Sequence, residues 1–168
     1  PKQFVSVENK NSLFQDTLKR LNDPMYSKPK VICNIDHRFM VRDQAKNIGL
    51  NLDSIFLEPV GKNTTSSAII SSASADKDSL ILLMPSDHII KNKKIFNESV
   101  KRGIKFAQEG KIILFGVKPT RAETGFGYIS VKKNMQYLVH DISKFIEKPN
   151  EKKAKKLLIS KLVFWNSG

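Results

Sequence analysis

The chain has 168 residues, of which 40% are hydrophobic and 27% charged, the size and composition of one globular domain. No apolar run approaches the roughly 20 residues of a membrane span, and no basic-then-apolar leader begins the chain. The net charge is +13, but lysine is spread along the chain, which favours a solvated surface over a nucleic-acid-binding patch. The lone cysteine, Cys33, excludes an internal disulfide and favours a cytoplasmic protein.

The first half of the chain alternates helix-like and strand-like segments. Ser12 and Gln15 are spaced as a capping box at the start of an amphipathic helix. The pattern then predicts a strand at 31–33, a helix at 36–48, a strand at 55–57, a helix from Asn63 or Thr64, and a strand at 80–84. The unbroken apolar run Leu80–Met84 is typical of a strand buried on both faces.

The second half begins with a helix whose apolar stripe ends before Gly110. The pattern then predicts a buried strand at 112–117, two antiparallel strands at 128–131 and 138–146, and a helix from Asn150 to Leu158. Strands that alternate with helices predict an α/β fold with a mostly parallel, doubly wound sheet and a late antiparallel addition.

Polar loops follow three of the predicted strands, at the sheet edge where ligands bind in open α/β folds. They are Glu58–Thr64, Pro85–His88 and Glu147–Pro149. Each has a plain alternative as a helix cap, a β-turn or an exposed turn. The histidines show no zinc-ligand spacing, and no Ser-His-Asp or Cys-His arrangement is indicated.

Taken together and in order, several segments resemble the mannose-1-phosphate guanylyltransferase (GDP-mannose pyrophosphorylase) family of bacterial sugar nucleotidyltransferases. The segments are Pro1–Phe4, Leu57–Thr64, Pro85–His88, Phe115–Arg121, Thr124–Ile129, Phe145–Pro149 and Trp165–Gly168. Each motif alone is weak evidence, whereas their joint order and spacing is strong.

The resemblance implies that mannose 1-phosphate attacks the α-phosphorus of GTP, with Mg²⁺ offsetting the developing charge. It matches Asp87 to the metal-binding aspartate, Lys2 to a lysine on the nucleotide phosphates, and Lys148 to the lysine on the sugar phosphate. The remaining matched positions bind substrate: Glu58, Gly61, Asn63 and Thr64 at the guanine, and Gly127, Glu147 and Asn166 at the sugar. GTP and mannose 1-phosphate are thus the expected partners, with neither nucleic acid nor membrane, and a homo-oligomer stays open.

The chain also departs from the family pattern. The glycine-rich loop that wraps the triphosphate is expected just before Pro1, and a second metal-binding aspartate is expected beyond Gly168. Lys62 stands where arginine is commoner. We therefore expect a Rossmann-like, GT-A-like nucleotidyltransferase fold, incomplete at both ends, as a single partial domain over 1–168 that is inactive alone.

Other interpretations and consequences follow from the same sequence. The alternatives are a relative that uses another sugar phosphate or base, a regulatory paralogue without turnover, and a basic nucleic-acid-binding module. A C-terminal isomerase domain stays open.

Without the first strand, segments 31–33 and 80–84 should not be directly paired. The chain alone should then be poorly stable, or dimerise or borrow a strand through the open edge.

Overall fold

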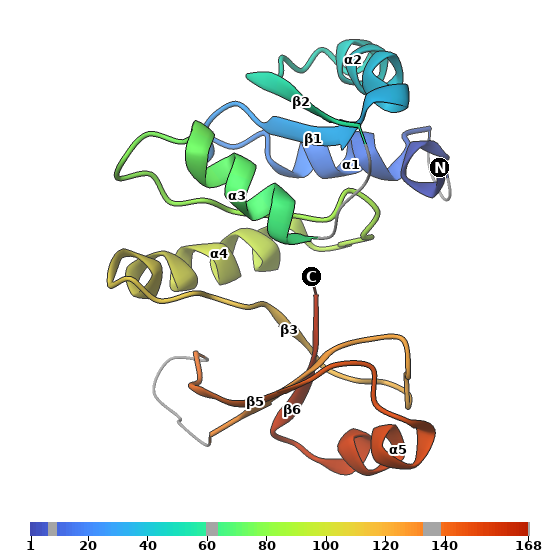
Figure 1. The fold of residues 1–168 in the computed structure, drawn as a ribbon, viewed down its shortest axis with the longest axis vertical. Coiled ribbons are helices and arrows are strands. Elements are labelled where there is room, and N and C mark those ends of the chain that lie inside the picture. The colour runs from blue at the N-terminus through green and yellow to red at the C-terminus, as the bar shows by residue number, and fades with distance from the viewer. Residues whose placement is uncertain (7–9, 60–63, 133–138, 168) are drawn as a thin grey trace. The chain divides into compact units, whose positions relative to one another are not determined.

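The structure is a computed structural model that describes residues 1–6, 10–59, 64–132 and 139–167 (Figure 1). It divides into two compact units, Pro1–Lys93 and Lys94–Gly168. No helix in the described residues is long and apolar enough to cross a membrane.

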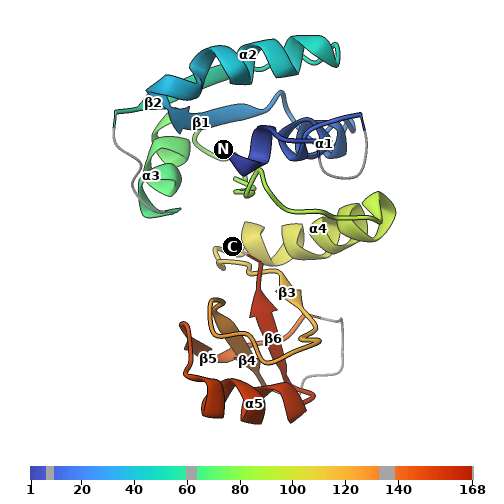
Figure 2. The same ribbon diagram turned by 90° about the vertical axis from the view of Figure 1, so that its right-hand side faces the viewer.

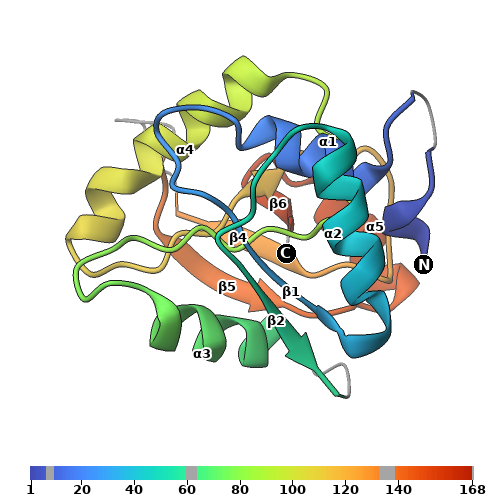
Figure 3. The same cartoon turned by 90° about the horizontal axis from the view of Figure 1, so that it is seen from above.

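The first unit is built on a parallel strand pair. Its elements are the 3₁₀ helices η1 (Lys2–Phe4) and η2 (Ile35–His37), the helices α1 (Leu13–Arg20), α2 (Arg38–Asn47) and α3 (Thr64–Ser74), and the strands β1 (Lys30–Asn34) and β2 (Ser54–Glu58). The strands pair with Val31 opposite Ile55, and they lie between α2 and α3 (Figures 1 and 3).

Local sequence explains how these helices begin and end. The Ser12 side chain accepts a hydrogen bond from the Gln15 backbone N–H, and the Gln15 side chain accepts one from the Ser12 backbone N–H. This confirms the predicted capping box of α1. Gly49 has a φ of +69° directly after the C-cap of α2, the backbone conformation that glycine adopts most easily. The core of the unit joins Phe14 and Leu18 of α1 to Val41 and Ala45 of α2.

The second unit is built on an antiparallel sheet. Its elements are α4 (Lys93–Gln108), which begins at the last residue of the first unit, β3 (Gly116–Val117), β4 (Tyr128–Val131), β5 (Ile142–Ile146), α5 (Glu151–Ile159) and β6 (Val163–Asn166). The strand order is β3-β6-β4-β5, and α5 lies against this sheet (Figure 2). Tyr128, Ile146, Ala154, Val163 and Trp165 form its buried core.

The prediction of a mostly parallel sheet is wrong for the described residues, because only β1 and β2 are parallel and the larger sheet is antiparallel. Residues 80–84 form no strand, and the predicted strand at 112–117 shrinks to Gly116–Val117. Leu80 and Ile112 are 46% and 89% exposed. An apolar run becomes a strand only where a neighbour completes its hydrogen-bond ladder. Because residues 80–84 form no strand, the gap expected between them and β1 stays a prediction.

Candidate functional site

Lys2 and Asp87, which the sequence predicts as functional, form an ion pair in the first unit. The Lys2 Nζ lies 2.8 Å from the Asp87 Oδ2, and the His88 Nε2 lies 3.8 Å from the Asp87 Oδ1. The Asp87 side chain is 25% exposed and that of Lys2 is 79% exposed. Phe4 holds η1, and Lys2 with it, through an edge-on contact with Phe14, 5.6 Å between ring centroids.

The Lys2–Asp87 pair changes the pKa of both groups. Burial raises the pKa of the Asp87 carboxyl, but the hydrogen bond and charge of Lys2, with the charge of His88, together hold this pKa below its ordinary value. The hydrogen bond and charge of Asp87 raise the pKa of the Lys2 ammonium. Asp87 therefore presents an ionised carboxylate at neutral pH.

Replacing Lys2 with methionine is expected to raise the pKa of Asp87. A carboxyl group whose pKa is lowered by folding stabilises the fold above its unfolded pKa and loses that contribution as the pH falls through its folded pKa. Without the ammonium, Asp87 should take up its proton at a higher pH than in the wild type. A ¹³C NMR titration of the Asp87 carboxyl measures this, with Lys10→Met as the exposed control. An unchanged pKa in Lys2→Met would contradict the ion pair.

The carboxylate of Asp87 suits a magnesium ion that substrate phosphates also ligate. Magnesium commonly takes one or two carboxylates plus phosphate oxygens and keeps several waters. Within the ranges that the structure describes, no group of three or more His, Cys, Asp or Glu side chains could hold a metal by itself. A single carboxylate such as Asp87 would therefore need oxygen ligands from another source to hold a magnesium ion.

Two of the predicted guanine-binding residues are described, one at the end of β2 and one at the start of α3. Glu58 is the last residue of β2 and Thr64 is the first of α3, whereas Gly61 and Asn63 lie outside the described residues. The Glu58 Oε1 accepts a hydrogen bond of 2.7 Å from the Ser66 Oγ. Ser66 was missed from sequence, and its only signal is a hydroxyl in the first turn of a helix that follows a strand.

The second unit brings together the residues predicted at the sugar. This group, here called the Gly127 cluster, consists of Gly127, Glu147, Lys148 and Asn166. The Asn166 backbone N–H donates to the Gly127 carbonyl at 2.8 Å, and the Lys148 Nζ lies 3.5 Å from the Glu147 Oε1. A Cβ on Gly127 would lie 2.8 Å from the Phe145 ring and 2.9 Å from the Glu147 Oε2, so a larger residue here would push both side chains away.

Two further features give the Gly127 cluster capacity for a ligand. The Asn166 Oδ1 is buried and has no hydrogen-bond partner among the described residues; buried polar atoms are normally paired. Lys148 has a φ of +39°, an uncommon conformation for a residue with a side chain. The cluster thus offers an ammonium, a carboxylate and an amide oxygen.

Residues to which the sequence analysis assigned no role shape the loop beside this cluster. The Arg121 guanidinium lies over the Trp165 ring, 5.4 Å from its centroid, and is paired with Glu123 at 3.0 Å. The backbone amide of Glu123 donates to the Tyr128 hydroxyl and its carbonyl accepts from that hydroxyl. The segment Thr124–Ile129 contributed to the family resemblance, but nothing in it identified these partners.

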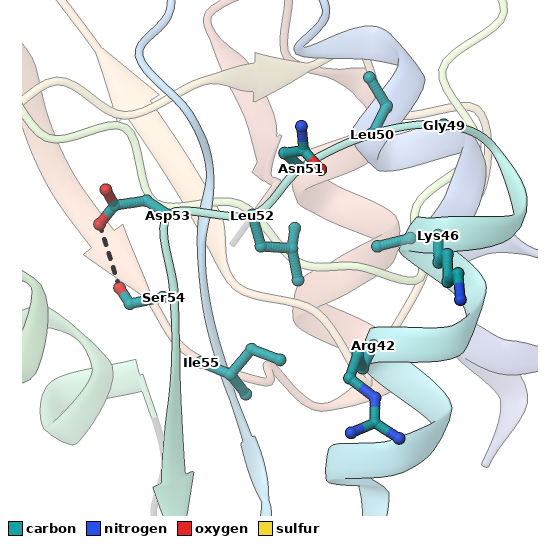
Figure 4. A pocket seen from close by; sticks show the side chains of 10 residues that line it. Arg42, Lys46, Gly49, Leu50, Asn51, Leu52, Asp53, Ser54 and Ile55 are labelled. Carbon is teal, nitrogen blue, oxygen red and sulfur yellow. Dashed lines mark hydrogen bonds between the residues drawn. The ribbon is translucent and has the colours of Figure 1, made fainter.

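A separate open pocket of about 450 Å³ lies at the C-terminal end of α2 (Figure 4). Arg42 and Lys46 line it together with apolar Leu50, Leu52 and Ile55. None of the residues predicted for function lies in it, so this pocket is not the candidate site.

Comparisons with known proteins identify the family of the chain. The family model described as nucleotidyl transferase matches residues 1–168. A mannose-1-phosphate guanylyltransferase of Sinorhizobium fredii is 41% identical over 99% of this chain and 34% of that protein. One of Salmonella muenchen is 38% identical over 100% of this chain and 37% of that protein.

A crystal structure described as mannose-6-phosphate isomerase from Helicobacter pylori matches with a TM-score of 0.88 and 33% identity. It covers 99% of this chain and 63% of that chain. The chain thus spans little more than a third of the length of these curated relatives. The solved structure matches the mixed α/β fold over 99% of this chain. Because the nucleotidyl transferase family model matches residues 1–168, the chain belongs to the nucleotidyl transferase family.

Proposed function

We propose that the complete protein containing this chain is a mannose-1-phosphate guanylyltransferase, which converts GTP and mannose 1-phosphate to GDP-mannose and pyrophosphate. The observation that carries the proposal is the 38–41% identity, over 99–100% of the chain, to relatives that bear this name. The proposal includes a Rossmann-like nucleotidyltransferase fold in the complete protein and a location in the cytoplasm. The second point is supported by the single cysteine among the 168 residues, Cys33, because disulfide-free chains are typical of reducing compartments.

In this reaction an oxygen of the sugar phosphate attacks the α-phosphorus of GTP. The bond from that phosphorus to the β-phosphate oxygen breaks, and the electron pair leaves with pyrophosphate. Such transfers require little covalent chemistry from the protein, which acts by positioning the reactants and by electrostatic stabilisation. The polar groups found in each unit suit this task.

Each unit contributes groups of a different kind. In the first unit, Lys2 contacts the nucleotide phosphates, Asp87 holds magnesium, and Glu58 and Thr64, with Gly61 and Asn63, bind the guanine. When bound, magnesium neutralises phosphate charge and stabilises the charge that develops on the leaving group. In the second unit, Lys148 neutralises the sugar phosphate, and Glu147, Gly127 and Asn166 bind the sugar.

Nucleotide selectivity tests the proposal. The complete protein is titrated with GTP, UTP and dTTP in the presence of Mg²⁺, and its thermal midpoint is followed. A ligand that binds only the folded state at 100 times its Kd stabilises it by about 2.7 kcal/mol, so GTP should raise the midpoint far more than the others. A preference for UTP or dTTP would indicate a different sugar nucleotidyltransferase. A steeply salt-dependent affinity for duplex DNA with no mononucleotide effect would indicate a nucleic-acid-binding module.

Replacing Lys148 with alanine is expected to weaken mannose 1-phosphate while leaving GTP binding nearly unchanged. The ammonium is a point charge suited to a phosphate, and loss of a charged hydrogen bond of about 1.5–3 kcal/mol corresponds to roughly 10- to 150-fold in KM. Steady-state kinetics with each substrate varied in turn measure this. Lys144→Ala, an exposed lysine of β5, is the matched control. An increase confined to the KM for GTP would show that the two phosphate assignments are reversed.

A further inference from the structure

The end of α1 holds the turn that carries Asp87. Arg20 is the last residue of α1 and is only 5% exposed. Its Nη2 donates a hydrogen bond of 3.1 Å to the backbone carbonyl of His88, the residue directly after Asp87. A buried charge is costly unless it is hydrogen-bonded, and hydrogen bonds from a charged donor are among the stronger ones. The Arg20 guanidinium therefore fixes the backbone one peptide away from the Asp87 carboxylate.

Two side chains tether the segment around Asp87, but only Arg20 holds the residue next to that carboxylate. Residues 79–92 contain no helix or strand, so no strand ladder fixes the position of the Asp87 backbone. A second tether lies at the far end of the segment, where the Lys93 Nζ donates to the carbonyls of Lys19 and Asn22 at 3.2 and 2.9 Å. These carbonyls lie at the C-terminal end of α1, where backbone acceptors are left without helical partners and a cation is favoured.

The same helix also positions Lys2, the partner of Asp87. The Ser12 Oγ, at the N-cap of α1, donates to the Gln44 Oε1 at 2.6 Å, and the Gln15 Nε2 donates to the Gln44 carbonyl at 3.0 Å. The Gln44 Nε2 in turn donates to the Phe4 carbonyl at 3.1 Å, at the end of η1. One end of α1 thus holds the helical turn of Lys2, and the other end holds the turn of Asp87.

We propose that Arg20 is a positioning residue for metal binding, which fixes the Asp87 carboxylate relative to Lys2 through the His88 carbonyl. The inference rests on the proposed role of Asp87 as a magnesium ligand. Magnesium demands near-ideal octahedral geometry, so a carboxylate that drifts with a loose turn binds it less well. Loss of a group that orients a metal ligand typically costs about 10- to 100-fold in metal affinity.

The test compares Arg20→Met and Arg20→Gln, which remove the guanidinium, with Arg20→Lys, which restores a cationic donor. All are made in the complete protein. Mn²⁺ binding in the presence of GTP, measured by electron paramagnetic resonance, reports the metal site without turnover. The Mn²⁺ dissociation constant should rise about 10-fold or more in the first two variants and recover partly in Arg20→Lys. The kcat should fall with the metal affinity, while the KM for mannose 1-phosphate stays within about twofold, because Arg20 acts on the metal-binding carboxylate and is not assigned to the sugar.

Two controls separate positioning from stability. Arg42→Met removes an exposed arginine of α2, and Lys93→Met removes the tether away from Asp87; both should keep wild-type Mn²⁺ affinity, even where Lys93→Met lowers the thermal midpoint. If either Arg20→Met or Arg20→Gln binds Mn²⁺ as the wild type does, the inference is wrong and Arg20 serves packing alone. Asp87→Asn is measured alongside to distinguish failure of this inference from failure of the proposed role of Asp87. Wild-type Mn²⁺ affinity in Asp87→Asn would show that Asp87 is not a metal ligand.

Discussion

Asp87→Asn is expected to lower the kcat of the complete protein by about 100-fold or more and to raise its magnesium requirement. The amide has no charge and one fewer anionic oxygen, so it binds a hard divalent cation far less well. Charge stabilisation by a bound metal is worth several kcal/mol, and each ~1.4 kcal/mol is tenfold in rate. Steady-state kinetics over a Mg²⁺ titration measure both effects.

The control for this substitution is Asp78→Asn. Asp78 is an exposed aspartate of the same unit, outside every motif that carries the family resemblance, and its replacement should leave both kcat and the magnesium requirement unchanged. A near-wild-type kcat for Asp87→Asn at low Mg²⁺ would show that this carboxylate does not hold the metal.

Tyr128→Ala is expected to lower the free energy of unfolding of the second unit by about 3–5 kcal/mol. Tyr128 is 0% exposed, and it lies in register between Ile146 of β5 and Trp165 of β6. Its hydroxyl makes two hydrogen bonds with the Glu123 backbone, at 2.9 and 2.8 Å. The substitution therefore opens a cavity at the centre of the core and also removes the partner of two partly buried backbone groups of Glu123.

Urea unfolding followed by the fluorescence of Trp165, the single tryptophan among the 168 residues, measures this effect. Tyr128→Phe isolates the hydroxyl and should cost about 1–3 kcal/mol, because it leaves the Glu123 backbone unsatisfied. Ile159→Ala, at a side chain that is 84% exposed, should change the free energy of unfolding by less than about 0.5 kcal/mol. Equal stability of Tyr128→Ala and wild type would contradict the assigned core.

The parts of the fold that depend on neighbours in sequence were predicted correctly. The cap of α1 joins Ser12 to Gln15, and the cap of α5 joins Asn150 to Lys153, so each interaction lies within one helical turn. The runs at β1 and β2 also became strands, because each completes the other's ladder. Leu80–Met84 has an equally strong apolar pattern but no strand partner among the described residues. The sequence of one segment does not predict a strand by itself, because strand formation depends on the neighbouring strands.

The candidate site shows the same division between local and distant information. Motif resemblance singled out Lys2 and Asp87, but nothing local to either residue indicated that they form an ion pair. Arg20, Ser66 and Glu123 were missed because each acts on a backbone or side-chain group that the helix and strand periods do not identify. The Gly127 cluster was predicted as separate positions, and antiparallel pairing of β4 with β5 and β6 brings them together.

The central claim is most directly tested by ³¹P NMR of the complete protein with GTP, mannose 1-phosphate and Mg²⁺. The account predicts that the signals of GDP-mannose and pyrophosphate grow in equal amounts and that both cease when the metal is chelated. Release of inorganic phosphate and GDP, or turnover of GTP that is independent of mannose 1-phosphate, would contradict nucleotidyl transfer to this sugar phosphate.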